Sequence, residues 1–284
     1  MEVETSPVDG SKGWDVKPSL LLERLQHVPS ASWLDSDVVV SGDLTRLLDG
    51  HDGRELIGTQ ETYWGQLQGG NHRALSWGLS PGRDLAATVN TGFLRVTSHH
   101  VPLLEAWRDL LADPRYLAAQ REPWQQRPVH LIGDQEVLTG LLASAEFAAV
   151  PLHLLRQGWD IAQCFGPAGL TPGARVRLAF RGHLPPLVHA MGPKPWVVRP
   201  APSGAAARAR WAYERLHHRW SPYTGVAARH PEAVAEPATW AGRPRGDLDV
   251  LLRELPLAVI DHAARWGRAR TGIGRYSVAA PAVD

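Results

Sequence analysis

Hydrophobic positions recur along this chain in two patterns, one spaced as in helices and one as in strands. Residues 16–28 place leucines at helical spacing behind Pro18, which suits a first helical turn because the missing N–H of proline costs nothing there. The same spacing predicts further helices, with a short one beginning at Asp43, a plausible N-cap. The other predicted helices span residues 101–114, 133–144, 203–220 and 247–269.

Short apolar runs between turn residues predict strands. The predicted strands span residues 31–34, 38–40, 56–60, 87–97, 149–155, 174–182 and 185–192. We expect the first of these to be buried and the fourth to be interrupted at Thr91 and Gly92. Residues 61–84, rich in Gly, Trp and polar side chains, indicate a surface loop. Strands mixed with helices throughout predict an α/β fold.

Composition narrows the class of protein. The 284 residues carry 30 Lys and Arg against 29 Asp and Glu, so net charge gives no reason to expect nucleic-acid binding. The single cysteine excludes an internal disulfide and a cysteine-based zinc cluster. No signal peptide is visible at the acidic N-terminus, and no run approaches the roughly 20 apolar residues of a membrane helix. We therefore expect a cytoplasmic protein.

The chain divides by composition into three predicted parts. Residues 1–13 form a polar lead-in that we expect to be disordered, and residues 14–200 hold the α/β domain. Residues 201–284 form a helical extension with 12 Arg and no Lys against 8 Asp and Glu. These basic helices could contact an anionic membrane surface or an acidic protein weakly. A helical cap with a solvated Arg face is the favoured alternative.

Two carboxylates flank a serine directly after a predicted strand, at Asp35 and Asp37. Carboxylates at this spacing can converge on one divalent cation, which prefers oxygen ligands and keeps positions open for phosphate oxygens. Such a cation could neutralise the charge on a leaving diphosphate. The alternative is a solvated turn in which both side chains cap local N–H groups, and turn statistics alone favour it.

A second segment with unusual residue types runs from His189 to Trp196. His189 ends an apolar run and could supply an imidazole ligand, while Gly192 permits close approach of backbone to a ligand. Lys194 is a compact cation suited to a phosphate group. Taken singly, His189 is better explained as a structural histidine, and Lys194 is better explained as a solvated surface lysine.

Four segments together resemble one family. Residues 33–44 (WLDSDVVVSGDL) resemble the Asp-x-Asp segment of glycosyltransferases with the GT-A fold. Residues 189–196 (HAMGPKPW) resemble the His-x-x-Gly-x-x-Lys-Pro-Trp signature of family 8 retaining glycosyltransferases, the group of glycogenin and the lipopolysaccharide galactosyltransferases. Residues 90–93 (NTGF) look like that family's Asn-(Ala/Ser)-Gly strand, and residues 134–135 (DQ) like its Asp-Gln helix start. The segments follow the family's order and cover about residues 14–200.

The resemblance implies a GT-A-like fold, with a mixed central sheet flanked by helices and a C-terminal helical extension. It implies a sugar transferred from a nucleotide-diphosphosugar donor, expected to be UDP-linked, to a hydroxyl acceptor with retained anomeric configuration. Asp35, Asp37 and His189 would bind Mn²⁺ (or Mg²⁺), and Gly192 and Lys194 would contact the diphosphate.

The remaining site residues also follow from the resemblance. Asn90 would face the donor sugar or the acceptor, and Asp134 and Gln135 would lie beside the anomeric carbon as catalytic residues. Lys17, on the helix that precedes the acidic turn, could point at the donor. We also expect residues 60–64 (QETYW) and Trp77 to contribute to the acceptor site, although core packing explains Trp residues at least as often.

Two departures from the family pattern leave other functions open. Gly192 and Lys194 are separated by one residue where the family usually has two, and only 34 residues precede Asp35. A strand–helix–strand unit takes roughly 30 residues or more, so the first nucleotide-binding strand is expected to be missing. The first alternative is therefore a non-catalytic or partner-completed GT-A-like domain. The second is a metal-dependent hydrolase, which only the three metal ligands favour.

Overall fold

The computed structural model describes most of the chain, and its contacts divide into two compact units. Unit 1 comprises Met1–Leu34, His51–Leu154 and Tyr276–Asp284, and unit 2 comprises Asp35–Gly50 and Leu155–Arg275. The described residues are 13, 15–61, 71–85, 87–164, 172–191, 200–219, 221, 223, 226, 255, 256, 259, 260 and 263.

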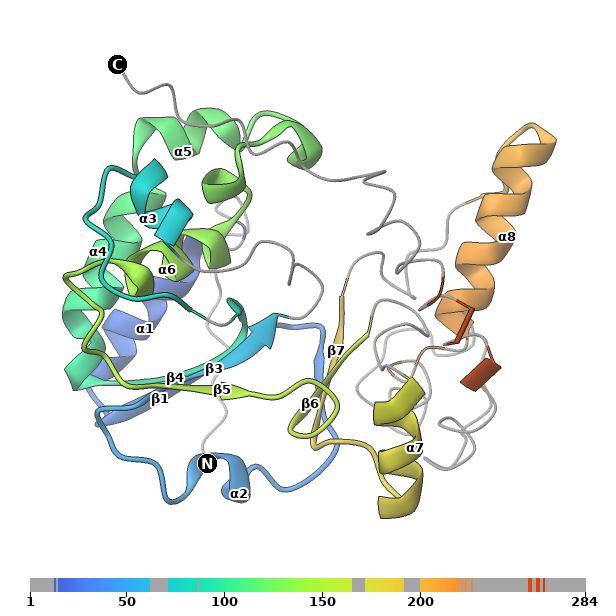
Figure 1. Cartoon of the computed structure of the whole chain (residues 1–284), viewed down its shortest axis with the longest axis horizontal. Helices are drawn as coiled ribbons and strands as arrows, with labels where there is room; N and C mark the ends of the chain where they lie inside the picture. Colours follow the sequence, from blue (N-terminus) through green and yellow to red (C-terminus); the bar gives the residue numbers. More distant parts are fainter. Residues whose placement is uncertain are drawn as a thin grey trace. The chain divides into compact units, whose positions relative to one another are not determined.

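Unit 1 is built on a four-stranded sheet in the order β1-β4-β3-β5 (Figure 1). These strands are β1 (Ser30–Leu34), β4 (Thr88–Thr97), β3 (Leu56–Glu61) and β5 (Leu152–Leu155). The strand β4 pairs antiparallel with β1 on one side and with β3 on the other. The central strand β4 is buried at nearly every position. The edge strand β1, expected to be buried, buries only Ala31.

The predicted interruption of β4 is a shift in pairing and not a break in the strand. Its ladder with β1 runs without a shift from Ser30 opposite Thr97 to Leu34 opposite Phe93. Its ladder with β3 changes register between Ile57 and Thr59. A shift in one ladder leaves some residues of the longer strand without a backbone partner on that side and alters the local twist.

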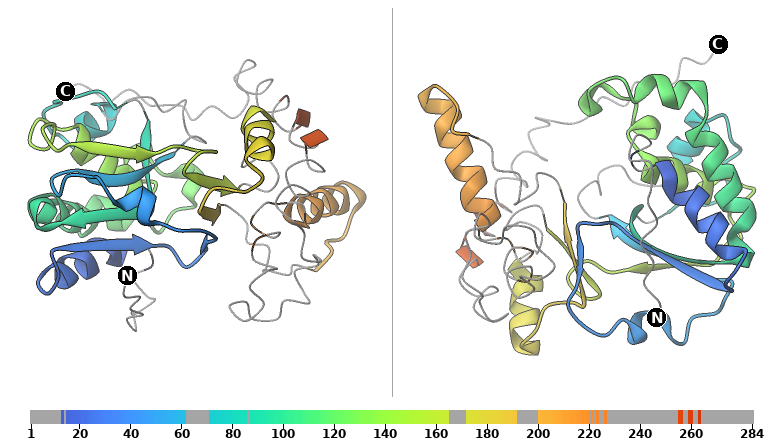
Figure 2. Two further views of the ribbon diagram at one scale, coloured as in Figure 1. Left: turned by 90° about the horizontal axis from the view of Figure 1, so that it is seen from below. Right: turned by 180° about the vertical axis from the view of Figure 1, so that it is seen from behind.

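Helices cover one side of this sheet, where α1 (Lys17–Leu25) and α4 (Val101–Leu111) lie (Figures 1 and 2). The core beneath them is made of fully buried aromatic and aliphatic side chains. Its largest members include Trp107, Tyr116, Leu94, Leu103, Leu104 and Leu138. The other helical segments of unit 1 are α3 (Asn71–Ser76), η2 (Ser98–His100), α5 (Pro114–Ala119), η3 (Trp124–Gln126), η4 (Val129–Leu131) and α6 (Asp134–Ala143).

The helix α3 corrects the expectation of a surface loop over residues 61–84. The sequence of α3 has no apolar stripe, yet Arg73 and Ala74 are completely buried and Trp77 is 5% exposed. Arg73 can be buried because it forms an ion pair with Glu136 of α6, which is itself buried. Gly140 of α6 lies against α3, since a Cβ there would come within van der Waals contact of Arg73 Cβ, at 3.4 Å. The helix α3 is thus stabilised by tertiary contacts that its own sequence does not predict.

Unit 2 holds a three-stranded mixed sheet in the order β2-β7-β6. The strands β2 (Val38–Val40) and β7 (Leu187–Ala190) are antiparallel, and β7 is parallel to β6 (Ile161–Cys164). The helices of this unit are α2 (Thr45–Leu48), α7 (Pro172–Arg181) and α8 (Ala205–Arg219). Among the described residues its core includes Ala162, Cys164, Ala174, Leu178, Leu184, Val188, Ala190, Tyr223 and Val226.

The helix α7 replaces the strand predicted over residues 174–182, and that prediction is wrong. Ala174 and Leu178 are buried on one face, whereas Val176 and Phe180 are exposed. Positions four apart share a face of a helix, whereas positions two apart share a face of a strand. The apolar residues of this short segment occur at both spacings, so the neighbouring core decided between them. The strand β6 was not predicted.

The predicted α/β class is confirmed, with sheets flanked by helices. The helices predicted over 16–28, 101–114 and 133–144 are present as α1, α4 and α6. Most of the helix predicted over 247–269, and the lead-in apart from Gly13, lie outside the described residues. Among the residues that are described, no helix is both long and apolar enough to cross a bilayer.

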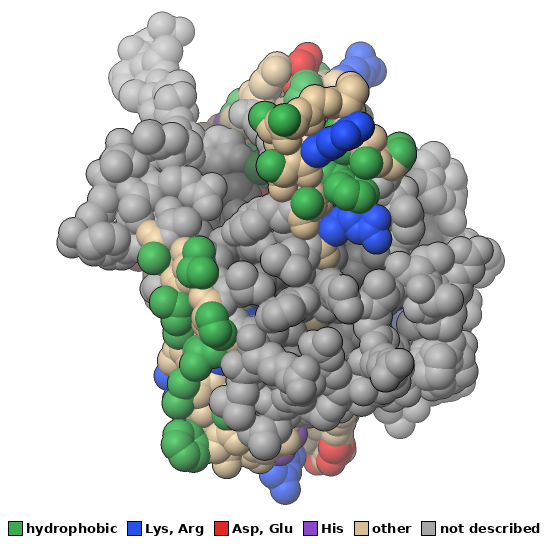
Figure 3. Space-filling model, turned by 90° about the vertical axis from the view of Figure 1, so that its right-hand side faces the viewer, with side chains coloured by type: hydrophobic (Ala, Val, Ile, Leu, Met, Phe, Trp, Pro, Cys, Tyr) green, Lys and Arg blue, Asp and Glu red, His purple; other side chains and the backbone are tan. Residues whose placement is uncertain are grey.

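Charged and apolar side chains lie next to one another on the surface of unit 2. Figure 3 views the side on which α7 and α8 lie in Figure 1, and hydrophobic side chains gather there with a few Lys and Arg among them. On α7, Phe180 is 89% exposed and Val176 is 41% exposed. The guanidinium groups of Arg177 and Arg181 lie 5.0 and 4.5 Å from the ring centroid of Trp159.

Candidate metal and polar sites

The acidic turn and the end of β7 bring three potential metal ligands together in unit 2. Asp35, Asp37 and His189 each offer one ligand atom, and these atoms all lie within 4.8 Å of one another. The ladder between β2 and β7 causes this meeting, because Val38 pairs with His189. The amide of Ala190 also donates a hydrogen bond to the carbonyl of Asp37 at 3.0 Å.

The three side chains differ in exposure and partners. Asp37 is 9% exposed and His189 is 4% exposed, whereas Asp35 is half-buried. His189 Nε2 lies 3.2 Å from Asp37 Oδ1, and its buried Nδ1 has no hydrogen-bond partner among the described residues. Burial raises the pKa of the Tyr223 hydroxyl, and the negative charge of Asp37 adds to that shift. Tyr223 therefore stays protonated beside Asp37 and can donate a hydrogen bond in this region.

The donor set fits a divalent cation. Two carboxylates and an imidazole are ligands that Mn²⁺ and Mg²⁺ accept, with open positions left for oxygen atoms of another molecule. Burying the charge of a carboxylate costs free energy unless a positive charge or hydrogen bonds compensate that charge. The residues present thus match the site that the sequence predicts, and the metal role itself stays a prediction.

Lys17 and Asp134 form a buried ion pair in unit 1. Lys17 Nζ lies 3.1 Å from Asp134 Oδ2, and the two side chains are 2% and 6% exposed. The same ammonium group donates to the hydroxyl of Thr91 at 3.0 Å and to its carbonyl at 3.3 Å. Thr91 in turn donates its hydroxyl proton to Asp134 Oδ2 at 2.7 Å. The indole N–H of Trp107 binds the carbonyl of Asp134 at 3.0 Å.

This arrangement gives Lys17 a local role, whatever else it binds. Its ammonium group connects the first turn of α1 to the start of α6 and to the middle of β4. Two charges can be buried only when they are paired and their remaining donors and acceptors are satisfied. The pair therefore fixes the orientation of Asp134, the residue expected to lie beside the anomeric carbon.

Asn90 and Gln135 continue the same polar layer. Asn90 Nδ2 donates to Gln135 Oε1 at 3.2 Å and to Glu61 Oε2 at 2.9 Å. Asn90 Oδ1 accepts from the amide of Gly92 at 2.9 Å. Gln135 is half-buried, whereas Asn90 is 3% exposed. Gln135 is thus the member of this group with the most access to a ligand.

A second buried ion pair was not anticipated from the sequence. Arg73 Nε donates to Glu136 Oε2, and Arg73 Nη2 donates to the hydroxyl of Thr88 at 2.9 Å. Burial raises the pKa of Glu136, and the charge and hydrogen bond of Arg73 oppose that shift. Glu136 directly follows the Asp134-Gln135 pair, so a second acidic side chain in the first turn of α6 was the available signal. Gln135 Nε2 joins the two networks by donating to Glu136 Oε1 at 3.3 Å.

The predicted site residues therefore meet in two groups, one in each unit. Lys17, Asn90, Asp134 and Gln135 belong to unit 1, and Asp35, Asp37 and His189 belong to unit 2. Gly192 and Lys194 lie outside the described residues. Of residues 60–64, also expected at the acceptor site, residues 62–64 lie outside them as well.

Trp77 belongs to the core of unit 1. It is 5% exposed, and its ring meets His130 edge-on at 5.6 Å between centroids. A buried indole offers no face for a sugar to stack on. The expectation that Trp77 contributes to an acceptor site is therefore wrong.

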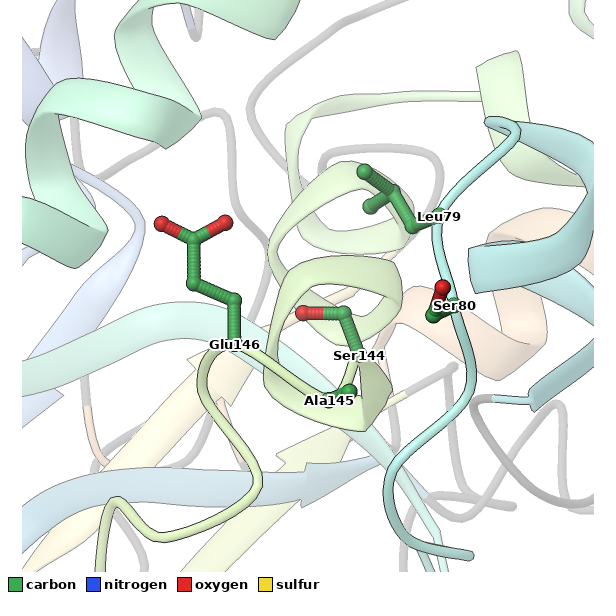
Figure 4. A pocket seen from close by; sticks show the side chains of 5 residues that line it. All are labelled: Leu79, Ser80, Ser144, Ala145 and Glu146. Carbon is green, nitrogen blue, oxygen red and sulfur yellow. The ribbon is translucent and has the colours of Figure 1, made fainter.

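A pocket of about 260 Å³ lies elsewhere in unit 1 (Figure 4). It is lined by residues that follow α3 and residues that follow α6. These residues are Leu79, Ser80, Ser144, Ala145 and Glu146. The two segments are joined by the amide of Ala145, which donates to the carbonyl of Ser80 at 2.7 Å. None of the predicted site residues lines this pocket.

Comparisons with known proteins give little beyond this. No family model and no curated protein sequence matches the chain. A solved structure aligns with it, described as the crystal structure of a glycosyltransferase involved in the glycosylation of the major capsid of PBCV-1. The two share 16% identity over 68% of this chain and 76% of that chain, with a TM-score of 0.38. An alignment at this identity and TM-score does not decide what the present chain does.

Proposed function

We propose that this protein is a glycosyltransferase that takes its sugar from a nucleotide-diphosphosugar, with UDP as the expected nucleotide. The observation that carries the proposal is the convergence of Asp35, Asp37 and His189 within 4.8 Å. These residues stand in the two segments whose sequences resemble the metal-binding segments of family 8 glycosyltransferases. A coincidental resemblance would not require two segments so distant in the sequence to meet at their polar side chains.

Asp35, Asp37 and His189 would hold Mn²⁺ or Mg²⁺ in this proposal. A bound cation supplies compensation for the charge that develops on the leaving diphosphate. Asp37 and His189 are held by the β2–β7 ladder, so their ligand atoms are positioned before any ligand binds. The half-buried Asp35 is the member that can adjust its side chain.

The residues of unit 1 would serve the sugar and the acceptor. Gln135 presents an amide and Asp134 a carboxylate at the start of α6, and both are acceptor groups that suit a developing positive charge. Lys17 and Thr91 would act as positioning residues by fixing the Asp134 carboxylate. The proposal includes transfer with retention of the anomeric configuration, because the family resemblance implies it.

Calorimetric titration of UDP and GDP, with and without Mn²⁺, tests the metal assignment. We expect Asp37→Ala to abolish the Mn²⁺-dependent part of UDP affinity, and His189→Ala to weaken that part alone. Asp49→Ala, an exposed carboxylate of the same unit, is the matched control and should bind as the parent does. Unchanged Mn²⁺-dependent affinity in Asp37→Ala would refute the metal site. Equal losses with and without Mn²⁺ in His189→Ala would make His189 structural.

Turnover separates transfer from the two alternative functions. UDP-sugar donors with mixed hydroxyl acceptors should yield glycosylated product that requires Mn²⁺, and Gln135→Ala should lower turnover with little change in UDP affinity. Release of free sugar at the same rate without any acceptor would favour the hydrolase. Folded protein that binds no UDP, with or without Mn²⁺, would favour a domain that needs a partner.

A further inference from the structure

A second group of metal-ligating side chains lies in unit 1, apart in the sequence from every predicted site residue. His51, Glu55 and His153 each offer one ligand atom, and these atoms lie within 4.8 Å of one another. His51 and Glu55 stand in the segment before β3, and His153 stands on β5. The side chains of His51 and Glu55 are 18% and 26% exposed, so the group is reachable from solvent.

The local geometry favours a shared ion over a simple ring contact. His51 Nδ1 lies 2.6 Å from Glu55 Oε2, and the rings of His51 and His153 have centroids 4.3 Å apart at an angle of 52°. Rings inclined in this way can turn one nitrogen each toward a common point, which parallel stacked rings cannot do. Zinc–ligand bonds of 2.0–2.1 Å place neighbouring ligand atoms about 3.3 Å apart. The three ligand atoms, all within 4.8 Å of one another, lie close to that separation.

The backbone that carries these ligands is held from several sides. The amide of Glu55 donates to the carbonyl of Asp52 at 2.9 Å, which closes a turn. The amide of Leu56 donates to the carbonyl of Pro151 at 2.9 Å, which fixes the segment of Glu55 next to the segment of His153. The hydroxyl of Thr97 donates to the carbonyl of Gly53 inside the turn. Such restraint lowers the entropy lost when a ligand orders a site.

We propose that His51, Glu55 and His153 form a zinc site that is distinct from the cluster of Asp35, Asp37 and His189. Two imidazoles and one carboxylate are the ligand set that zinc accepts with a fourth position left for water. The cluster in unit 2 is richer in oxygen and suits Mn²⁺ or Mg²⁺. We therefore expect the two sites to differ in metal preference, with zinc in unit 1 and Mn²⁺ or Mg²⁺ in unit 2.

The place of the zinc site in the chain suggests what the ion does. His51 is the first residue of unit 1 after the chain leaves unit 2 at Gly50, and His153 comes two residues before the chain re-enters unit 2 at Leu155. An ion bound by both residues would hold together the two segments of unit 1 that carry His51 and His153. An ion that binds the folded state and not the unfolded one stabilises the protein by an amount that rises with the logarithm of the ion concentration above the dissociation constant.

The test is a Zn²⁺ titration of the full chain, prepared without a polyhistidine tag and treated with a chelator. The background is His189→Ala, so that failure of the proposed glycosyltransferase site cannot affect the result. We expect one Zn²⁺ to bind and the melting temperature to rise. His153→Ala in that background should weaken binding at least about tenfold and remove the rise. Co²⁺ should give the intense visible absorption of a four-coordinate ion in the background chain and lose it in the His153 variant.

Two further variants keep the outcome decisive. His27→Ala removes an exposed histidine and should bind Zn²⁺ as the background chain does. Glu55→Gln preserves the shape of the side chain and removes its charge, so it should weaken Zn²⁺ binding even if His153→Ala folds poorly. Zn²⁺ binding that is absent from the background chain, or unchanged in both ligand variants, would overturn the proposal and leave a histidine pair with one hydrogen-bonded carboxylate.

Discussion

The buried pair of Lys17 and Asp134 offers the sharpest test of the structure. Replacing Lys17 with Met removes the ammonium group that lies 3.1 Å from Asp134 Oδ2 and leaves the hydrogen bond that the Thr91 hydroxyl donates to that oxygen. Both side chains are nearly inaccessible to water, so the carboxylate cannot recover its lost partner from solvent. Removing one member of a buried ion pair typically costs about 3–5 kcal/mol, and we expect a loss of that size.

A double-mutant cycle separates the pair from its surroundings. Asp134→Asn alone leaves the ammonium group of Lys17 with the two Thr91 oxygens, and we expect it to be destabilising as well. The double variant should be more stable than the sum of the single losses predicts, by about 1–3 kcal/mol, because neither charge is then left unpaired. Urea unfolding at pH 7, followed by circular dichroism and Trp fluorescence, measures the three losses.

Glu23→Gln is the control, since Glu23 is exposed on the same helix and its change should stay within about 0.5 kcal/mol. Additive losses in the double variant would refute the ion pair. A loss below about 1 kcal/mol for Lys17→Met would show that Lys17 is solvated, as most helical lysines are.

Three other changes test separate features of the structure. Burial, with nearby positive charge, lowers the pKa of His130 to about 4. The unfolded chain therefore binds more protons between pH 6.5 and 4, so stability should fall as the pH drops through that window, and His130→Gln should reduce the fall in acid-unfolding curves. Gly82→Ala would place a Cβ 2.5 Å from Ala145 Cα. This backbone clash should lower the free energy of unfolding, measured with urea, by about 1–3 kcal/mol. Leu178→Ala should lower the free energy of unfolding by about 2–5 kcal/mol, whereas Phe180→Ala should lower it by less than about 0.5 kcal/mol in the same assay. Similar losses in the two variants would indicate the strand that the sequence predicts.

The elements that the sequence predicts well are those whose signals are local. The helix α1 combines Pro18 in its first turn with an apolar face, and α4 and α6 likewise carry their own spacing or helix-start residues. The side chain of Asp43 accepts from the amide of Thr45 at 2.8 Å, but the residue at the N-cap of α2 is Leu44, so the predicted cap is wrong by one residue. Signals of this kind involve neighbours in the sequence, and they hold before the chain has folded.

The predictions that fail concern segments whose partners lie far away in the sequence. The helix α3 exists because Arg73 finds Glu136, and α7 is a helix because Ala174 and Leu178 face the core of unit 2. Neither partner can be read from a window of ten residues. A buried charge looks like a surface residue in a sequence until its counter-ion is known.

The sequence by itself determined the α/β class, the positions of the strongly patterned helices to within about three residues, and the residue types available for metal and sugar chemistry. Only the tertiary structure decided which of those residues meet. Register in the β2–β7 ladder sets His189 opposite Val38, and a slip of one residue would turn the imidazole to the other face of the sheet. The contacts of Lys17 with Asp134, and of His51 with His153, likewise depend on strands and helices packed from distant parts of the chain. Local spacing fixes side-chain direction within one element, but proximity between elements follows from burial and backbone pairing across the whole fold.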